Sequence, residues 1–307
     1  MAARWDLVGA VWQVRRQVRA ALLGIDAARR EQSLLARDAA TRQQLIQLLA
    51  GQLRAGDVSS YELAQARIAL IRATLARQDA AGRLQQQRVA LAHALGLPVR
   101  ALHGVRLSFA SLRELPRHLD RARSRQRALL HRSDVRAALA RYAAAQSALQ
   151  LQIARQWPDI HLGPGFTWDA QLAGDRQWQL GLSLPLPVLN HNQGPIAQAR
   201  AQRALAAAHF MTVQAAALAQ IDGAMAAYGA ARAQLMTANS LLGALGQQVN
   251  SVRAQVRAGE LQPLDLADAR LAYEAGARSG LDAQIRAQQA LGRLETVLQS
   301  PIPRGRP

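Results

Sequence analysis

The chain has 307 residues, of which 50% are hydrophobic and only 4% aromatic, and it contains no cysteine. The length allows two domains or one elongated body. The lack of cysteine excludes disulfides, thiolate metal sites and a cysteine nucleophile. Because no run of about 18 apolar residues is apparent, the sequence predicts no transmembrane helix. Alanine supplies much of the apolar content, and such small residues favour closely packed helices over a thick globular core.

The basic residues are numerous and spread along the whole chain. The formal net charge is +18, and all 38 basic residues are arginine. Clustered basic residues are typical of nucleic-acid binding, but these arginines are scattered along every predicted helix. We therefore expect them to act as general surface cations whose stems cover apolar surface. A basic, helical nucleic-acid-binding protein is the least favoured alternative, and no nucleic-acid partner is expected.

The first part of the chain predicts two helices. The pattern is helical and free of proline from Ala2 to about Leu53, and it resumes from Glu62 until Gly96, Leu97 and Pro98 stop it. Residues 99–130 are mixed and arginine-rich, so they predict an irregular connection with at most one small helix. Ser133 and Asp134 then supply a helix N-cap, which predicts a helix over 133–157.

The period of the sequence changes after this helix from helical to alternating, which predicts a β-hairpin over 159–187. Its strands span about nine to ten residues on either side of a turn near Gly174. One face carries the apolar side chains Ile160, Leu162, Phe166, Trp168, Trp178, Leu180, Leu182 and Leu184. Such strands suit a membrane β-barrel, and they equally suit a soluble hairpin packed on a helix bundle. Because a lone hairpin cannot close a barrel, the membrane interpretation requires several chains.

The longest predicted element is a helix over 195–258, which Pro195 opens at a favourable first-turn position. Its apolar residues recur at three- and four-residue steps, the spacing of a coiled coil. A return helix follows over 264–299, until Pro301 and Pro303 end the pattern.

One short motif occurs twice, as Arg-Ala-Gly-Asp at 54–57 and as Arg-Ala-Gly-Glu at 257–260. Aligning 54–70 with 257–273 gives eight identities in seventeen positions, which indicates an internal duplication. Glycine between two helical stretches ends the first helix, and the acidic residue after it suits the start of the next. Both copies therefore predict the tip of a helical hairpin, at 54–60 and at 257–263.

No chemistry-bearing motif is visible. The seven histidines show no pairing at helical ligand spacing, and no HExxH, P-loop or GxSxG sequence occurs. We therefore predict no catalytic residue, no cofactor and no metal site, and the chain is not expected to be an enzyme.

The order of helix, β-hairpin, very long helix, glycine tip and return helix resembles the TolC family of outer-membrane efflux channels. Residues 182–194, Leu-Ser-Leu-Pro-Leu-Pro-Val-Leu-Asn-His-Asn-Gln-Gly, are most similar to its CzcC-like, heavy-metal branch. Residues 131–136 resemble the start of that family's second repeat. The resemblance implies a mainly α fold with a small β part. Long antiparallel helical hairpins would form an α-barrel subunit, and one β-hairpin would belong to a membrane β-barrel, in two imperfect repeats. Residues 1–98 would be the remainder of repeat 1 and 131–307 would be repeat 2.

The resemblance also implies a function. Such a chain forms a homotrimer that is a passive export conduit in the outer membrane with a periplasmic extension. A periplasmic adaptor (membrane fusion) protein joins it to an inner-membrane RND pump, and the branch implies heavy-metal cations as cargo. The implied adaptor contacts lie at the tips and comprise Arg54, Gly56, Asp57, Arg257, Gly259 and Glu260. The apolar face of the hairpin would face outer-membrane lipid.

Asp265 and Asp268 lie just past the second tip, where family members narrow the periplasmic mouth with acidic residues. Three chains would bring six carboxylates to this gate. The alternative for both aspartates is ordinary first-turn helix charge. The first repeat carries Glu62 and Gln65 at the matching positions, so its contribution would be weaker.

The repeat alignment pairs Met1 with Ala204, so the first repeat has no counterpart of residues 131–203. We therefore expect an N-terminally truncated chain without a signal peptide or a first hairpin. The main alternative function is a soluble coiled-coil scaffold or interaction protein. A scaffold should bury the leucines and tryptophans of the hairpin, whereas a membrane strand pair should expose them.

Overall fold

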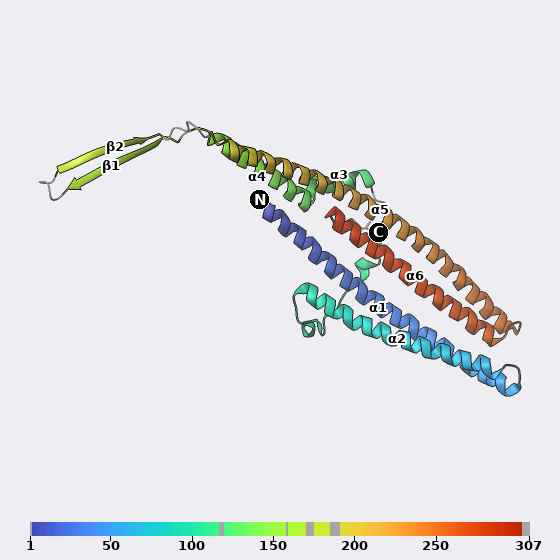
Figure 1. Cartoon of the computed structure of the whole chain (residues 1–307). Coiled ribbons are helices and arrows are strands. Elements are labelled where there is room, and N and C mark those ends of the chain that lie inside the picture. Colours follow the sequence, from blue (N-terminus) through green and yellow to red (C-terminus); the bar gives the residue numbers. More distant parts are fainter. Residues whose placement is uncertain (1, 117–119, 158, 170–174, 185–190, 303–307) are drawn as a thin grey trace. The chain divides into compact units, whose positions relative to one another are not determined.

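The computed structural model describes residues 2–116, 120–157, 159–169, 175–184 and 191–302. Most of them are helical (Figure 1). In chain order the elements are α1 (Ala2–Ala55), α2 (Ser60–Leu95), the 3-10 helices η1 (Val99–Leu102) and η2 (Ala110–Leu112), α3 (Arg121–His131), α4 (Ser133–Ala154), β1 (His161–Asp169), β2 (Asp175–Ser183), α5 (Gln193–Ala258) and α6 (Pro263–Leu298). The predicted fold class, long helical hairpins with one small β-hairpin, is confirmed.

The chain divides into two compact units. The first comprises Met1–Asp6 and Ser133–Ala216, and because it holds both strands we call it the strand unit. The second comprises Leu7–Arg132 and Ala217–Pro307, and because it holds both glycine tips we call it the tip unit. Helices α1 and α5 each contribute residues to both units.

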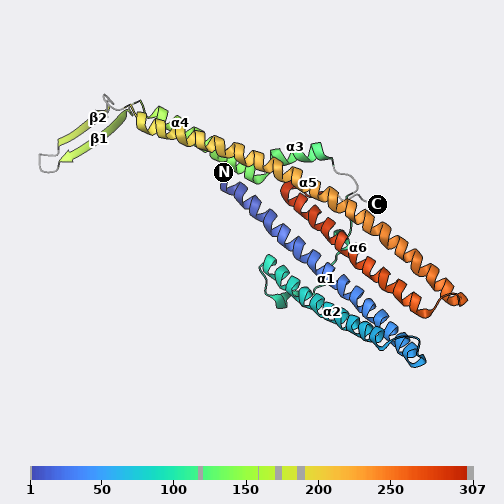
Figure 2. The same cartoon turned by 45° about the vertical axis from the view of Figure 1, so that its right-hand side comes forward.

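Two helical hairpins make up the tip unit. Helices α1 and α2 form the first hairpin, and the later part of α5 with α6 forms the second (Figures 1 and 2). Arg83 on α2 donates to Glu31 on α1 at 2.7 Å. Helix α1 also runs antiparallel to α6, because Thr41 bonds to Glu274 while Gln52, closer to the first tip, bonds to Gln262 at the start of α6.

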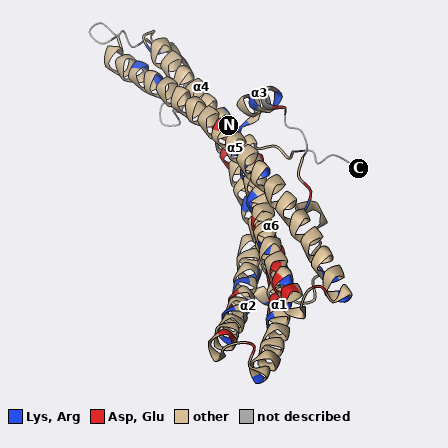
Figure 3. Cartoon of the chain, turned by 90° about the vertical axis from the view of Figure 1, so that its right-hand side faces the viewer, with Lys and Arg blue, Asp and Glu red and all other residues tan. Residues whose placement is uncertain are grey.

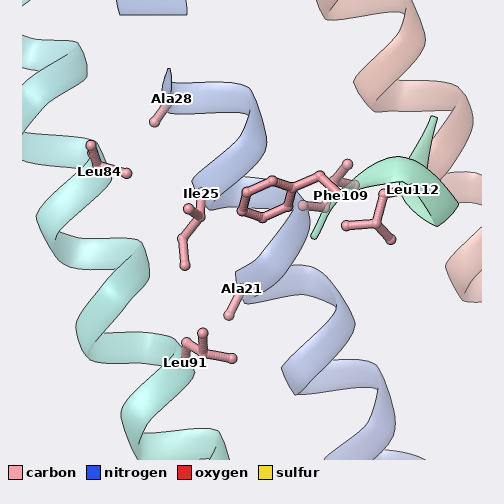
Figure 4. Close-up of a cluster of buried hydrophobic side chains, with 8 residues drawn as sticks. Ala21, Ile25, Ala28, Leu84, Leu91, Phe109 and Leu112 are labelled. Carbon is pink, nitrogen blue, oxygen red and sulfur yellow. The ribbon is translucent and has the colours of Figure 1, made fainter. Parts of the chain in front are cut away.

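The segment between the first hairpin and α4 is held against the helices by its apolar side chains. Phe109 directly precedes η2 and Leu112 ends it. Both pack with Ile25 of α1 and with Leu84 and Leu91 of α2 (Figure 4). A second buried cluster joins the three helices α3, α5 and α6; its members are Ala128, Ile221, Ala224, Met225, Tyr228, Leu291, Leu294 and Leu298. The irregular connection predicted at 99–130 therefore contains two 3-10 turns and nearly all of α3.

Glycines line the contact between α5 and α6, and at Gly276 the close approach requires one. A Cβ atom built on Gly276 would collide with the Leu245 side chain, and one built on Gly280 would touch Leu242 at 3.9 Å. On the other helix, a Cβ atom on Gly246 would lie 3.6 Å from the ring of Tyr273. Leucine knobs of α5 thus rest on glycine positions of α6.

The strand unit contains α4, the start of α5 and an antiparallel pair of strands. Leu149 of α4 is buried with Ile196 and Ala199 of α5. Strands β1 and β2 pair in a register that places Leu162 opposite Leu182 and Phe166 opposite Trp178. Residues 170–174 and 185–187 of the predicted hairpin lie outside the described part of the chain.

Helix α5 contains a stretch that is more apolar than the sequence analysis expected. An 18-residue window within Gln193–Ala258 has a mean hydropathy of 1.4, so this helix is long and apolar enough, by length and composition only, to cross a membrane. The prediction from sequence passed over this window because it required an unbroken apolar run. The many alanines of α5 raise the mean hydropathy without forming such a run.

Candidate functional site: paired helix tips and an apolar strand face

The first tip is a left-handed glycine turn. Helix α1 ends at Ala55, and Gly56 follows with a φ of +88°. The amide of Gly56 donates to the Leu53 carbonyl at 3.2 Å, and that of Asp57 donates to the Gln52 carbonyl at 2.9 Å. This pair of bonds is the Schellman motif, in which glycine adopts a conformation that costs other residues about 1 to 2 kcal/mol.

The second tip repeats this geometry. Gly259 has a φ of +77°, and its amide donates to the Val256 carbonyl at 3.2 Å. The amide of Glu260 donates to the Gln255 carbonyl at 2.9 Å. The duplicated motif thus encodes the same turn twice, and the six tip residues singled out in the sequence are all exposed; they are Arg54, Gly56, Asp57, Arg257, Gly259 and Glu260.

Both return helices begin with a carboxylate that caps the backbone. The amide of Ser59 donates to Glu62 at 3.1 Å, and the Ser59 hydroxyl accepts from the Glu62 amide at 3.3 Å. In the second copy, the amide of Gln262 donates to the Asp265 carboxylate at 2.9 Å. The capping arrangement was not recognised in the sequence, although Ser-x-x-Glu at 59–62 is its usual signature.

The structure brings the two tips together within the tip unit. The amide side chain of Gln52 donates to that of Gln262 at 2.9 Å. Leu264, at the start of α6, packs on a small core of the first hairpin that includes Leu49, Leu63 and Val58. One polar bridge and one apolar contact therefore join loops that are about 200 residues apart in sequence.

The two candidate gate aspartates differ in what they contact. Both are exposed residues in the first two turns of α6, but Asp265 is engaged by the backbone of Gln262. The pKa of Asp268 is raised above its ordinary value. The larger cause is that neighbouring atoms shield its carboxyl group from water, and the nearby Asp265 carboxylate adds to the shift. Asp265 thus has a structural role at the helix start, whereas Asp268 carries a charge that its surroundings disfavour.

A polar seam joins α1 to α6 above the tips, and sequence reasoning missed it. Thr41 donates to buried Glu274 at 2.8 Å, and Arg42 holds buried Asp38 through contacts of 2.8 and 3.2 Å. Further along the seam, Arg19 bonds to Gln288 and forms an ion pair with Glu295; these distances are 3.0 and 3.3 Å. Each residue alone resembles an ordinary surface position of a helix, so only the pairing of distant helices reveals their burial.

The strand pair exposes one continuous apolar face. The register puts the even-numbered residues of both strands on the same side. On that side and at the ends of the strands, Ile160, Leu162, Phe166, Trp178, Leu180, Leu182 and Leu184 are all exposed, from 45% for Leu184 to 81% for Trp178. The rings of Phe166 and Trp178 lie 4.9 Å apart. The side chain of Trp168 lies outside the described part of the structure.

The opposite face of the strand pair is small and polar. It presents His161, Gly163, Gly165 and Thr167 from β1, and from β2 it presents Gln179, Gly181 and Ser183. Among the described residues, no group of three or more histidine, cysteine, aspartate or glutamate side chains could hold a metal ion. Arginines are distributed along the helices rather than confined to one of them (Figure 3).

Comparison with known proteins identifies this arrangement. A family model described as outer membrane efflux protein matches residues 125–299, which is more than half of the chain. No curated protein sequence matches the chain significantly. Several solved structures match it well in fold.

Three of these structures illustrate the similarity. A membrane protein from Pseudomonas aeruginosa is 20% identical with a TM-score of 0.77, and the match covers 97% of this chain and 70% of that one. VceC, an outer membrane protein from Vibrio cholerae, is 18% identical with a TM-score of 0.77, with coverage of 97% and 72%. The open state of the Neisseria gonorrhoeae outer membrane channel MtrE is 20% identical with a TM-score of 0.74, with coverage of 97% and 68%. The family match and the shared fold together show that this chain belongs to the outer membrane efflux protein family and has the fold of TolC-like channels.

Proposed function

We propose that this chain is a subunit of an outer-membrane channel that serves as the passive export conduit of a tripartite, RND-type efflux system. The observation that carries the proposal is the exposed apolar face of the strand pair, because a soluble scaffold should bury these side chains. Nine-residue strands with apolar side chains on one face and small or polar ones on the other match the pattern of membrane β-barrels. The strands would then lie in outer-membrane lipid and the helices in the periplasm.

The apolar face provides a direct test with a matched control. Leu180→Arg places a charge on the proposed lipid face, and Gln179→Arg places the same charge on the opposite face. A lipid-facing arginine costs about 2 to 4 kcal/mol at the bilayer midplane. With an export signal peptide fused to both variants, we expect Leu180→Arg to abolish recovery of the protein in outer-membrane fractions, while Gln179→Arg preserves it. Equal recovery of the two variants would contradict the proposal.

We further propose that three copies form the channel. Helix α2 exposes a stripe of large apolar residues: Tyr61, Ile68 and Leu75 follow at seven-residue steps, Val89 follows two such steps later, and Ile71 lies beside them. Such spacing is that of a coiled-coil seam, which needs a partner helix. A second copy of this chain would supply that helix. Leu75→Asp should prevent trimer formation in detergent, as measured by light scattering, whereas aspartate at exposed Ala90, which lies off this stripe, should not.

The paired tips are the proposed contact site for a periplasmic adaptor protein. Their six exposed residues project from turns of identical geometry, so the two proposed repeats, 1–98 and 131–307, would present equivalent loops. Because the chain contains no cysteine, single cysteines at Asp57 and at Glu260 can report contact by cross-linking. We expect adaptor cross-links from both tips and none from a cysteine at exposed Glu114.

Asp265 and Asp268 are the proposed periplasmic gate. Their carboxylates lie one turn apart and would converge from three chains on one aperture, where they attract cations and oppose anions. Replacing both by alanine should lower cation selectivity in planar bilayer recordings. If selectivity does not change, the two aspartates serve only the start of α6.

The proposed cargo is heavy-metal cations, and this rests on the similarity of residues 182–194 to the CzcC-like branch. The channel supplies a bore and the pump selects, so cargo is tested with the whole assembly. Cells that carry the assembly should tolerate divalent heavy-metal salts better than cells with the Leu180→Arg subunit. Protection against organic dyes without protection against metals would contradict the metal assignment.

A further inference from the structure

Glu274 is a buried carboxylate of the tip unit. It lies on α6 at the seam with α1 and is only 9% exposed. Its Oε1 atom accepts a hydrogen bond from the Thr41 hydroxyl at 2.8 Å. Its Oε2 atom is buried and has no hydrogen-bond partner among the described residues. A carboxylate with a buried, unpaired oxygen is costly in its ionised form.

The charges around Glu274 come mainly from α1. Asp38 is buried one turn from Thr41 and is held by Arg42, and Arg37 lies on the same helix. On α5, Leu245 lies against Gly276 and Gly246 lies against Tyr273, both close to Glu274 in sequence, and neither α5 residue carries a charge. On α6 itself, Arg270 bonds to Gln44 at 3.4 Å and Arg278 is exposed. No cation is therefore paired directly with Glu274 among the described residues.

These surroundings favour a proton on Glu274 while the seam is closed. Burial is the largest cause that raises the pKa of Glu274, and the Asp38 carboxylate adds to it. The pKa is lowered in turn by the Thr41 hydroxyl, Arg37 and Arg42. If the seam opens, water reaches the carboxyl group and its pKa returns towards the ordinary value. The closed seam thus binds the proton more tightly than the open one, so acid stabilises closure and the stabilisation is lost as pH rises through the raised pKa.

We propose that Glu274 is a proton-responsive positioning residue that sets how tightly the second helical hairpin is held against the first. The seam continues from Thr41 and Glu274 down to the bridge between Gln52 and Gln262, so its closure determines how close the two tips lie. Ionisation of Glu274 loosens the hairpins from each other, and protonation draws them together. The consequence for conduction rests on the proposed channel function, whereas the movement of the tips does not.

The movement can be measured on the full chain in detergent, with spin labels on cysteines introduced at Asp57 and Glu260. Double electron–electron resonance then reports the distance between the tips. As the pH rises through the raised pKa of Glu274, we expect the fraction of chains with closely spaced tips to fall several-fold. Glu274→Gln retains an acceptor for Thr41 without the charge, so it should keep the tips close at every pH.

A second variant separates proton binding from a merely structural role. Thr41→Val has nearly the same shape but loses the hydroxyl that favours the ionised carboxylate, so it should shift the transition to higher pH. Glu31→Gln removes a carboxylate that pairs with Arg83 inside the first hairpin, so it should leave the transition unchanged. A pH response that survives Glu274→Gln, an unshifted transition in Thr41→Val, or tips that do not respond to pH would each overturn the proposal.

Conductance of bilayer-inserted channels supplies an independent readout. If the tips separate with rising pH and conductance rises with them, both the proton response and the channel function are supported. If the tips separate but no conductance is seen for any variant, the proton response stands and the proposed channel function fails. If the tips do not move, the inference fails whatever the conductance does.

Discussion

The two tips share one backbone and differ in what they display. Each ends in a Schellman turn with bonds of 3.2 and 2.9 Å, and each return helix starts with a carboxylate on the backbone of its N-cap residue. Beyond that point the copies diverge, because the first carries Ser59 and Gln65 where the second carries Gln262 and Asp268. The two tips thus share the turn, and the side chains around it distinguish the two hairpins.

The largest expected difference between the copies lies in their packing. Leu63 and Leu266 occupy equivalent repeat positions, but Leu63 is buried in the core of the first tip and Leu266 is only half-buried. Leu63→Ala should destabilise the first tip by about 2 to 5 kcal/mol, as expected for a buried leucine. Hydrogen exchange of the helix ends measures this local stability. Leu266→Ala should have a clearly smaller effect, and equal losses would mean that both tips pack alike.

The glycines should behave identically in the two copies. Gly56→Ala and Gly259→Ala each force a side chain into the left-handed region and should cost about 1 to 2 kcal/mol of local stability. Gly51 is a matched control, because it is helical and has open space around it. Gly51→Ala should instead stabilise α1 by up to about 1 kcal/mol. Unequal losses at Gly56 and Gly259 would show that the two turns are not equivalent.

The N-caps of the two return helices should also differ between the two tips, with a smaller effect on local stability. Ser59→Ala removes the hydroxyl that accepts from the Glu62 amide and should cost about 1 kcal/mol at the start of α2. The start of α6 should be unaffected, since Asp265 caps Gln262 and Pro263 presets the first turn. Ser60→Ala, one position inside the helix, is the control. Faster amide exchange at the start of α6 in Ser59→Ala would contradict this expectation and show that the stabilities of the two helix starts are coupled.

The smallest expected effect is a shift in pH dependence. Because the pKa of Asp268 is raised, its charge is lost at a higher pH than that of an ordinary aspartate as the solution is acidified. In bilayer recordings, cation selectivity should therefore decline on acidification at a higher pH than an ordinary aspartate would produce. Asp268→Asn should remove this decline, whereas Gln65→Asn, its counterpart in the first copy, should preserve it. A decline that persists in Asp268→Asn assigns the titration to another group.

Local signals in the sequence were sufficient for the helices and the turns. Gly96, Leu97 and Pro98 end α2 as predicted, and Gly96 has the left-handed φ of +67° expected of a helix stop. The alternation of Leu180 and Leu182 with small residues correctly predicted a strand. These features depend on neighbours in sequence, which is why periodicity and turn chemistry found them.

The polar seam could not be predicted, because its burial depends on partners far away in the chain. Gln288 is 1% exposed, and its side chain meets Arg19 and the carbonyl of Glu114. Arg132 is similarly buried while its guanidinium binds the Val297 carbonyl and Gln220. Arginine and glutamine usually lie on protein surfaces, so the sequence alone favours exposed positions for Gln288 and Arg132, which are in fact buried.

The glycine contacts between α5 and α6 have a consequence for how the second hairpin could be engineered. A Cβ atom at Gly276 would collide with the Leu245 side chain, whereas one at Gly246 or Gly280 would lie at ordinary contact distance from Tyr273 or Leu242. Replacing Gly276 in turn by alanine, serine and valine would therefore work as a set of wedges of increasing thickness. Each wedge pushes against Leu245 of α5 without changing a charge, so the series separates the spacing of the two helices from electrostatics.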